Sequence, residues 1–323
     1  MRVYFHHTIL ANLYANMGLM DSAPRTVRKA VIAAAGFGTR FLPQTKAMPK
    51  EMLPIVDKPI IQYVVEELVD AGIQDIIIVT GYSKRSIEDH FDNPNQDLIN
   101  NLIKGGKSKQ LLLEEIKKIA DLANFVYVRQ KGPYGNAAPL MSVEHLIGEE
   151  PFIFSWGDDF VKASPSRFKQ LIDVYQKHTA SVLTCVPAKG DPDYKRYGFV
   201  GGEQIEPALM LVKKIVEKPG SKEKASSNYA TVSSYLFTPE LFSYLHQAKK
   251  QLSPGEEFIM QPCLQKMIDD GHKIYGCQIV NGKYYDTGNK LEYLKTVVDF
   301  VLQHKGIGRP FAAYLEQKLK EIK

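Results

Sequence analysis

Between residues 28 and 187, apolar and β-branched runs alternate with segments of helical periodicity, and few folds accommodate such an order. The run 30–35 ends at Gly36, which is typical of a buried strand that enters a glycine turn. Residues 60–69 follow with apolar side chains at helical spacing, and 73–80 is again apolar almost throughout. A strand, a helix and a second strand in this order predict a βαβ unit with two parallel strands.

The same alternation continues along the chain up to residue 187. Further helices are expected near residues 84–90, 110–123, 137–147 and 165–178, and further strands near 125–129, 151–156 and 181–186. This order predicts an α/β domain whose sheet is doubly wound, mostly parallel and Rossmann-like. In such a sheet, ligands bind at the carboxyl ends of the strands.

The pattern changes after residue 187, where shorter strands are separated by loops rich in Gly, Pro, Lys and Ser. We therefore expect an α/β core at 28–187 and a smaller α+β lobe, which returns to the core, at 188–300. A loose N-terminal extension is expected at 1–27 and a C-terminal helix at 301–323. The total length of 323 residues fits about two such units.

Charge and cysteine content restrict the functions that remain. The 41 Lys and Arg exceed the 36 Asp and Glu by a net +5, which is too small and too dispersed for a nucleic-acid surface. Cys185, Cys263 and Cys277 lie far apart, so neither a disulfide framework nor a zinc site is expected. No apolar run approaches the roughly 18 residues that cross a membrane, and the first 20 residues do not resemble a secretory signal. We expect a cytoplasmic globular protein that binds neither nucleic acid nor membrane.

The segment 36–54 follows the first expected strand and combines glycines with cations. The glycines are Gly36 and Gly38, and the cations are Arg40, Lys46 and Lys50. Glycine lets backbone N–H groups approach an anion closely, while fixed cations neutralise its charge. The segment therefore predicts a binding site for a polyphosphate.

Two common phosphate motifs do not match this segment. The dinucleotide fingerprint requires a third glycine, but Phe41 occupies that position. The P-loop requires Gly-Lys-Ser/Thr at the start of a helix, and the segment has none. The simplest alternative is a glycine turn with solvated lysines, although three cations within eleven residues of a βα turn argue against it.

The order of residues in this segment resembles a known signature. It reads Gly-x-Gly-Thr-Arg from Gly36, then Pro-Lys-Glu-Met from Pro49 and Lys-Pro at Lys58. The chain resembles the sugar-nucleotide pyrophosphorylases, and among them the bacterial UTP–glucose-1-phosphate uridylyltransferases. The resemblance covers roughly residues 28–300. It also includes Val128-Arg129-Gln130, Asp158-Asp159, Tyr197-Gly198, Val216-Glu217-Lys218-Pro219 and Tyr285-Asp286-Thr287-Gly288.

The resemblance implies a reaction of UTP with glucose 1-phosphate that yields UDP-glucose and pyrophosphate. The sugar phosphate attacks the α-phosphorus directly, without a covalent enzyme intermediate. Because both reactants are anions, the protein has to align them and to neutralise charge in the transition state. The resemblance further implies Mg²⁺ as cofactor and a homodimer or homotetramer as the assembly.

The resemblance also assigns the nucleotide site. Arg40 and Lys50 hold the triphosphate and the departing pyrophosphate, with Lys46 as a helper. The backbone of Ala33, Ala34, Gly36 and Gly38 approaches the nucleotide. Gln130, flanked by Gly132 and Gly135, is expected to bind one edge of uracil, because its amide both donates and accepts hydrogen bonds. Without this context, Gln130 is an ordinary surface glutamine.

The sugar and the metal have their own assigned residues. Gly198 leaves room for the sugar ring, Glu217 accepts hydrogen bonds from its hydroxyls, and Lys218 binds the 1-phosphate. Asp158 is the expected Mg²⁺ ligand, since it follows the strand 151–156, and Asp286 is a candidate second ligand. The alternatives are a solvated turn at Asp158-Asp159, a helix N-cap at Asp286 and an exposed strand end at Glu217-Lys218.

Three segments depart from the usual family pattern. Trp156-Gly157 precedes the acidic pair, and 132–136 replaces a glycine-rich stretch. Both flank the nucleotide, so another pair of substrates, such as dTTP with glucose 1-phosphate, is a rival to UTP with glucose 1-phosphate. The segment 255–258 also differs and is expected to concern mainly lobe and subunit packing. A catalytically silent sugar-nucleotide-binding protein is a further alternative, against which Arg40, Lys50 and Asp158 argue.

Overall fold

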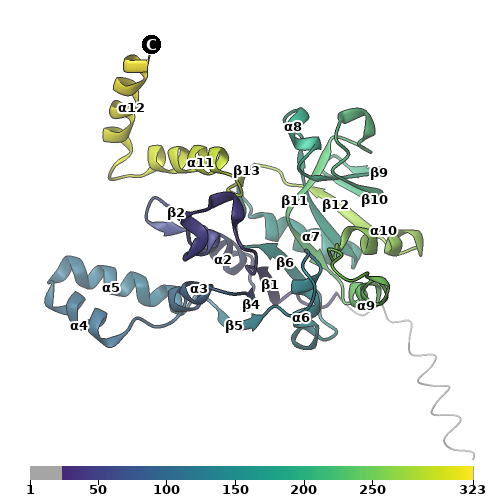
Figure 1. The fold of residues 1–323 in the computed structure, drawn as a ribbon, viewed down its shortest axis with the longest axis horizontal. Coiled ribbons are helices and arrows are strands. Elements are labelled where there is room, and N and C mark those ends of the chain that lie inside the picture. The colour runs from purple at the N-terminus through teal and green to yellow at the C-terminus, as the bar shows by residue number, and fades with distance from the viewer. Residues whose placement is uncertain (1–23, 323) are drawn as a thin grey trace, which may run out of the picture.

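The computed structural model describes residues 24–322, in which helices cover both faces of a central nine-stranded sheet (Figure 1). In sheet order, the strands are β5 (Asn124–Arg129), β4 (Asp75–Thr80), β1 (Lys29–Ala33), β6 (Phe152–Trp156), β11 (Tyr229–Phe237), β8 (Ser181–Pro187), β12 (Ile274–Gln278), β10 (Leu209–Glu217) and β9 (Gly198–Glu206). The expected α/β class is thereby confirmed. Residues 1–23, which hold most of the extension expected at 1–27, lie outside the described part of the chain.

Side chains of the central strands alternate between two separate cores, because successive residues of a strand point to opposite faces. On β1, Ala30 and Ile32 contribute to the core covered by α2 (Ile60–Asp70) and α7 (Arg167–His178). Val31 contributes to the other core, which is covered by α6 (Ala138–Ile147), α9 (Leu241–Gln251) and α10 (Gln261–Asp269). The strands are apolar on both faces because helices pack on both.

The expectation of a mostly parallel sheet is wrong, because half of the sheet is mixed. The neighbours β5, β4, β1 and β6 are parallel, but β11 runs antiparallel to both β6 and β8. Strand β10 is antiparallel to β12 and to β9. Only Pro207 and Ala208 separate β9 from β10, and so short a loop permits only a hairpin, since a parallel crossover requires about a dozen residues or more.

The segment expected to form the second lobe shares this sheet with the core. Strands β9 to β12 all come from residues 188–300, and β11 inserts between β6 and β8. The segment also has a small core of its own, in which Tyr194, Phe199, Ala230 and Val232 are buried. The change of pattern after residue 187 therefore marks a segment that extends the same continuous sheet and adds a small core of its own.

Short ribbons and outlying helices complete the described chain. The ribbons pair β7 (Asp159–Ala163) with β13 (Gly282–Asp286) and β2 (Pro54–Ile55) with β3 (Lys58–Pro59). The remaining helices are α3 (Arg85–His90), α4 (Gln96–Lys104), α5 (Lys107–Ala120), α8 (Asp191–Tyr194), α11 (Lys290–Gln303) and α12 (Gly308–Ile322). The helices α4, α5 and α12 project from the body on the same side (Figure 1). Within residues 24–322, no helix combines the length and the apolar composition needed to cross a membrane.

Candidate active site

The carboxyl ends of β1, β4, β5 and β6 meet at one edge of the sheet, and the loops that follow them surround a cavity of about 440 Å³. We call it the strand-end cavity. Five of the residues expected to bind nucleotide line it, namely Ala33, Gly36, Lys50, Gln130 and Gly135. Ala34 does not, because its side chain is buried in the core under α2. Lys46 is exposed and lies outside this cavity.

The two glycines of the loop 36–54 have different structural roles. Gly38 has a left-handed φ of 65°, and its carbonyl accepts a 2.7 Å hydrogen bond from the Thr45 hydroxyl. A Cβ at Gly38 would lie 3.2 Å from the Cβ atoms of Thr45 and Lys50, so the chain folds tightly over itself here. Lys50 is thereby placed next to Gly36, whose Cβ position is 3.9 Å from the Lys50 ammonium. Gly38 thus supports the site without lining it.

Lys50 and Asp158 form an ion pair at the edge of the cavity. The Lys50 Nζ lies 2.5 Å from Asp158 Oδ2, and the two side chains are 23% and 12% exposed. Burial by itself would lower the pKa of Lys50, but attraction to Asp158 and Glu51 outweighs it, so the pKa is raised. The lysine is therefore a permanent cation beside a largely buried carboxylate.

A second ion pair, between Glu51 and Lys84, lies next to the first. Glu51 Oε2 is 2.7 Å from the Lys84 Nζ, and their side chains are 0% and 5% exposed. Burial raises the pKa of Glu51 above its usual range, although Lys84 opposes the shift. This pair connects the loop 36–54 to the loop after β4, which also lines the strand-end cavity. Sequence analysis missed it, because a Glu and a Lys 33 residues apart carry no mark of contact.

Asp158 and Asp286 face the same point in space, although they come from different segments. A Cβ on Gly288 would lie 3.0 Å from Asp286 Oδ1, 3.8 Å from Asp158 Oδ2 and 3.4 Å from Arg40 Nη1. Arg40 also donates a 3.3 Å hydrogen bond to the Gly288 carbonyl, and the Thr287 hydroxyl donates to the carbonyl of Asp158. The ribbon of β7 and β13 produces this arrangement, because its register pairs Asp159 with Asp286.

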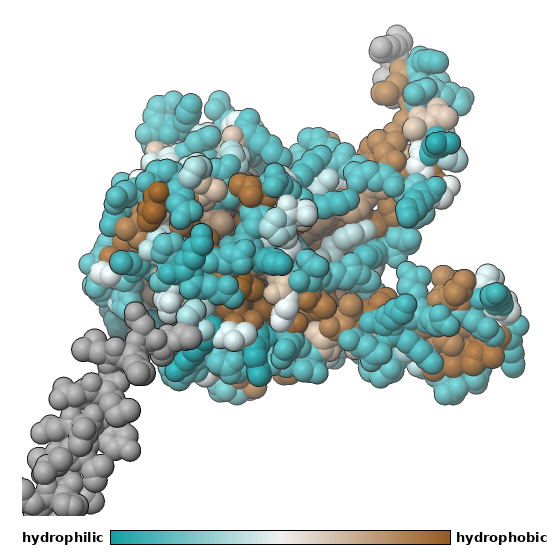
Figure 2. Space-filling model, turned by 180° about the vertical axis from the view of Figure 1, so that it is seen from behind, coloured by the Kyte–Doolittle hydropathy of each residue, from teal (hydrophilic) through white to brown (hydrophobic). Residues whose placement is uncertain are grey.

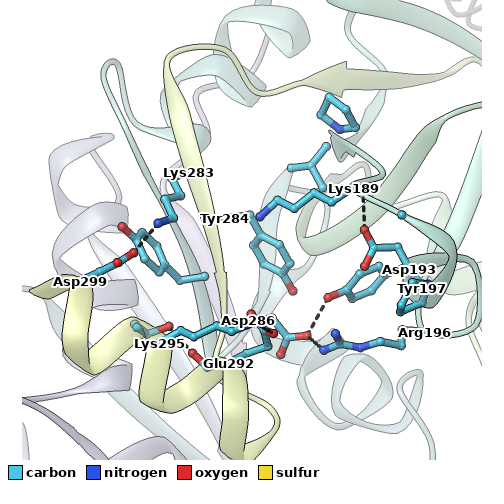
Figure 3. Close-up of a pocket in the computed structure, with 16 residues that line it drawn as sticks. Lys189, Asp193, Arg196, Tyr197, Lys283, Tyr284, Asp286, Glu292, Lys295 and Asp299 are labelled. Atoms are coloured by element: carbon cyan, nitrogen blue, oxygen red, sulfur yellow. Dashed lines mark hydrogen bonds and ion pairs between the residues drawn. The ribbon is translucent and has the colours of Figure 1, made fainter. Parts of the chain in front are cut away.

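Asp286 is held by groups on three sides. Its Oδ2 accepts hydrogen bonds from the Arg196 guanidinium and, at 2.7 Å, from the Tyr197 hydroxyl, and both side chains point toward it (Figure 3). Its Oδ1 accepts a 2.8 Å hydrogen bond from the Gly288 N–H. The alternative that Asp286 caps a helix is wrong, because Asn289 is the N-cap of α11 and accepts from the Glu292 N–H at 3.0 Å.

Asp159, the second member of the acidic pair, points away from Asp158. It accepts hydrogen bonds from the Ser233 hydroxyl at 2.8 Å and from the Tyr284 hydroxyl at 3.0 Å. Burial, together with the negative charge of Asp158, raises the pKa of Asp159 to about 7. Its contacts are internal, so its role is to attach β7 to the sheet and to β13.

The residues expected to bind the sugar also lie together. Register pairs Gly198 on β9 with Glu217 on β10, and a Cβ on Gly198 would lie only 2.8 Å from Glu217 Oε2. Burial raises the pKa of Glu217, although Lys218 opposes the shift. Lys218 has a left-handed φ of 45°, which is uncommon for a residue with a Cβ, and its N–H donates to the Tyr197 carbonyl at 3.1 Å.

Lys218 lines a second cavity, of about 540 Å³, which we call the basic cavity. Arg40, Lys195 and Arg196 contribute further cations to its wall, and Asp286 lies at its margin. Sequence analysis predicted Arg40 and Lys218 but missed Lys195 and Arg196. Lys195 and Arg196 stand directly before the Tyr197-Gly198 motif, and this position is the sequence signal that could have identified them.

The loop 132–137 is joined to the segment 257–261 by backbone contacts. The Phe258 N–H donates to the Tyr134 carbonyl at 2.7 Å, and the Phe258 carbonyl accepts from the Ala137 N–H at 3.1 Å. A Cβ on Gly135 would lie 2.1 Å from the Phe258 carbonyl oxygen, so only glycine fits there. Glu257 lines the strand-end cavity. The segment 255–258, for which we expect a role mainly in lobe and subunit packing, therefore also helps to build the cavity.

The chain is similar to known proteins over most of its length. The chain matches a model of the nucleotidyl transferase family over residues 29–301. A relative from Bacillus subtilis, described as a UTP–glucose-1-phosphate uridylyltransferase, is 44% identical over 297 residues, which are 92% of this chain and 99% of the relative.

Two solved structures are similar in fold and in sequence. A UDP-glucose pyrophosphorylase in complex with UDP-glucose has a TM-score of 0.76 and 36% identity, covering 86% of this chain and 100% of that one. A UTP-bound enzyme of the same kind from Acinetobacter baumannii has a TM-score of 0.80 and 32% identity, covering 92% of this chain and 100% of that one. The matching family model, the aligned length and the shared fold lead to one conclusion: the chain belongs to the nucleotidyl transferase family.

Proposed function

We propose that the chain transfers a uridylyl group from UTP to glucose 1-phosphate, with release of pyrophosphate. The observation that carries this proposal is the Lys50–Asp158 pair, which lies at the strand-end cavity and within reach of Arg40 and Asp286 at the basic cavity. A nucleotide in the first cavity and a sugar phosphate in the second would meet at this pair. The names of the relatives and of the solved structures support the choice of UTP and glucose 1-phosphate.

The protein's own groups suit a direct displacement. Lys50 places positive charge at the strand-end cavity, where the nucleotide would lie, and Lys218 and Arg196 place it at the basic cavity, where the sugar phosphate would lie. Arg40 lines the basic cavity as well and lies close to Asp158 and Asp286, where it would reach the phosphates of both reactants. The attacking phosphate oxygen is already an anion, so the chemistry requires no general base. Fixed cations stabilise the extra charge of the pentavalent transition state and of the departing pyrophosphate. Glu217, opposite Gly198, accepts hydrogen bonds from sugar hydroxyls.

Asp158 and Asp286 fit a Mg²⁺ ion as its protein ligands. Both carboxylates lie within 4 Å of the Cβ position of Gly288, and the backbone around them is held by Thr287 and Arg40. Across residues 24–322, no cluster of three or more His, Cys, Asp or Glu side chains is arranged for a metal. Two carboxylates completed by phosphate oxygens and water are the usual surroundings of Mg²⁺. The bound ion would neutralise phosphate charge at the reacting phosphorus.

A pyrophosphate-release assay tests the proposed activity. Purified protein is mixed with UTP, dTTP, CTP, ATP or GTP and with glucose 1-phosphate or another sugar 1-phosphate, with and without Mg²⁺. We expect rapid release only with UTP and glucose 1-phosphate, and only with Mg²⁺ present. Release with a different pair would keep the mechanism and change the substrates. A folded protein that binds UDP-glucose but releases no pyrophosphate would instead be a silent binding protein.

We also propose that the chain forms a homodimer or a dimer of dimers through its projecting helices. Leu98, Ile103, Leu111 and Leu112 on α4 and α5 are exposed, and so are Tyr314 and Leu319 on α12. Apolar side chains gather on both projecting arms (Figure 2). Exposed apolar patches of this kind are typical of association surfaces. Light scattering should give two or four times the mass of one chain, and a monomer at micromolar concentration would contradict the proposal.

A further inference from the structure

Three large aromatic side chains around the strand-end cavity are exposed to solvent. They are Phe37 (58% exposed), Tyr82 (79%) and Tyr134 (70%), from the loops after β1, β4 and β5. Within residues 24–322, most of the other large aromatic side chains are buried or half-buried. Three exposed rings around one cavity therefore indicate that their faces serve a ligand.

Phe37 and Tyr134 approach each other across the mouth of this cavity. Their ring centroids are 5.8 Å apart, and the rings are inclined by 53°. We call these two residues the aromatic pair. Their spacing lies within the range of favourable aromatic contacts, yet each ring keeps most of its surface in solvent. The pair thus offers a preformed apolar wall with exposed π-faces.

The position of Tyr134 is set by the backbone rather than by its own side chain. Its carbonyl accepts the Phe258 N–H, and Gly135 packs so closely on Phe258 that no Cβ fits. Asn136 adds two side-chain hydrogen bonds, accepting from the Met260 N–H at 2.8 Å and donating to Gln261 Oε1 at 2.9 Å. The ring is therefore presented by a loop that is anchored to the segment 258–261, and little entropy is lost when a ligand contacts it.

The cavity presents different chemistry to the two ends of a ligand. Lys50 offers a fixed positive charge, while the aromatic pair offers flat apolar faces. A molecule with an anionic end and a flat ring matches both, and a nucleotide is such a molecule. On the basis of the function proposed above, we infer that Phe37 and Tyr134 bind the nucleobase by stacking, and that Tyr134 sets the affinity for the nucleotide.

Stacking and hydrogen bonding make different predictions about base choice. Every base has a π-face, so a stacking residue contributes to the binding of all nucleotides alike. An amide such as that of Gln130 contacts the edge of the base and discriminates among bases. Loss of the Tyr134 ring should therefore weaken UTP and CTP binding by the same factor, without changing the preference between them.

Trp156 allows the affinity for nucleotides to be measured without catalysis. It is the single tryptophan of the chain and lines the strand-end cavity, so its fluorescence should report nucleotide binding. UTP and CTP are titrated in the absence of glucose 1-phosphate against the full-length protein and its Tyr134→Leu, Tyr134→Phe and Tyr244→Leu variants. Tyr244 is a half-buried tyrosine on α9 that lines neither the strand-end cavity nor the basic cavity, and it serves as the control.

We expect Tyr134→Leu to raise the dissociation constants of UTP and CTP by about tenfold each, as loss of one base–aromatic stack implies. Tyr134→Phe keeps the ring and should restore most of the affinity, while Tyr244→Leu should bind as the unchanged protein does. The KM for glucose 1-phosphate should not follow the change. Unchanged UTP affinity in Tyr134→Leu would overturn the inference, and so would an equal loss in Tyr134→Phe. Failure of the unchanged protein to bind any nucleotide would count against the proposed function instead.

Discussion

Replacement of Asp158 by Asn is expected to lower kcat for UDP-glucose formation by about 100- to 1,000-fold, the scale found when one preorganised electrostatic group is removed from a reacting centre. The substitution keeps the size of the side chain but removes the charge that pairs with Lys50 and that faces Asp286. Because Glu51 remains beside Lys50, the ammonium keeps a counter-charge and the fold should persist. Initial rates across a range of Mg²⁺ concentrations measure the effect, and thermal unfolding checks the fold.

A surface pair provides the control for Asp158. Lys266 on α10 and Asp270, directly after that helix, form an ion pair of similar length, 2.6 Å, but both side chains are well exposed. Asp270→Asn should leave kcat and its Mg²⁺ dependence unchanged, since exposed pairs of this kind contribute little. If Asp158→Asn kept a kcat within tenfold of the unchanged protein, with the same Mg²⁺ dependence, Asp158 would not be a metal ligand.

Replacement of Lys218 by Ala is expected to raise the KM for glucose 1-phosphate by roughly 10- to 100-fold, which corresponds to the loss of one hydrogen bond to a charged group. Lys218 is exposed at the wall of the basic cavity, and its left-handed backbone directs the chain between Glu217 and Pro219. The KM for UTP should change little, because Lys218 does not line the strand-end cavity. Steady-state kinetics with each substrate varied in turn separate the two effects.

Lys214 is the matched control for Lys218. It lies on β10, the strand that ends directly before Lys218, is also exposed, and is not part of the basic cavity. Lys214→Ala should therefore leave both KM values unchanged. An equal rise of the KM for UTP in Lys218→Ala would show a general disturbance of the site, and an unchanged KM for glucose 1-phosphate would remove the proposed role in binding the sugar phosphate.

Much of the site was predictable because its signals are local. The run of β1 into Gly36, the cations Arg40 and Lys50 and the position of Asp158 after β6 are all visible over short windows of sequence. Helix α2 was predictable for the same reason, since its apolar side chains follow one helical face. The roles of the individual residues came from resemblance to a family and stay predictions until variants are measured.

What the sequence could not supply is contact between distant segments. Lys50 and Asp158 were each predicted, but their pairing spans 108 residues and depends on β1 and β6 being neighbours. The contacts of Arg196 with Asp286 and of Phe258 with Tyr134 are equally long in range. No local periodicity records such contacts, because they follow from the order in which strands assemble.

The strands show which features of the fold the sequence predicts and which only the tertiary structure reveals. An apolar run was enough to predict β1, β4, β6 and β8, because burial on two faces leaves a compositional mark, whereas the short ribbon strand β7 was not predicted. Strand direction leaves no such mark, so the antiparallel entry of β11 between β6 and β8 appeared only in the tertiary structure. The chain's local chemistry determined that a loop rich in glycine and cations follows one strand and that a carboxylate follows another. Only the packing of the sheet decided which distant residues complete the site, because hydrogen-bonded neighbours in a sheet are chosen by topology and not by adjacency in sequence.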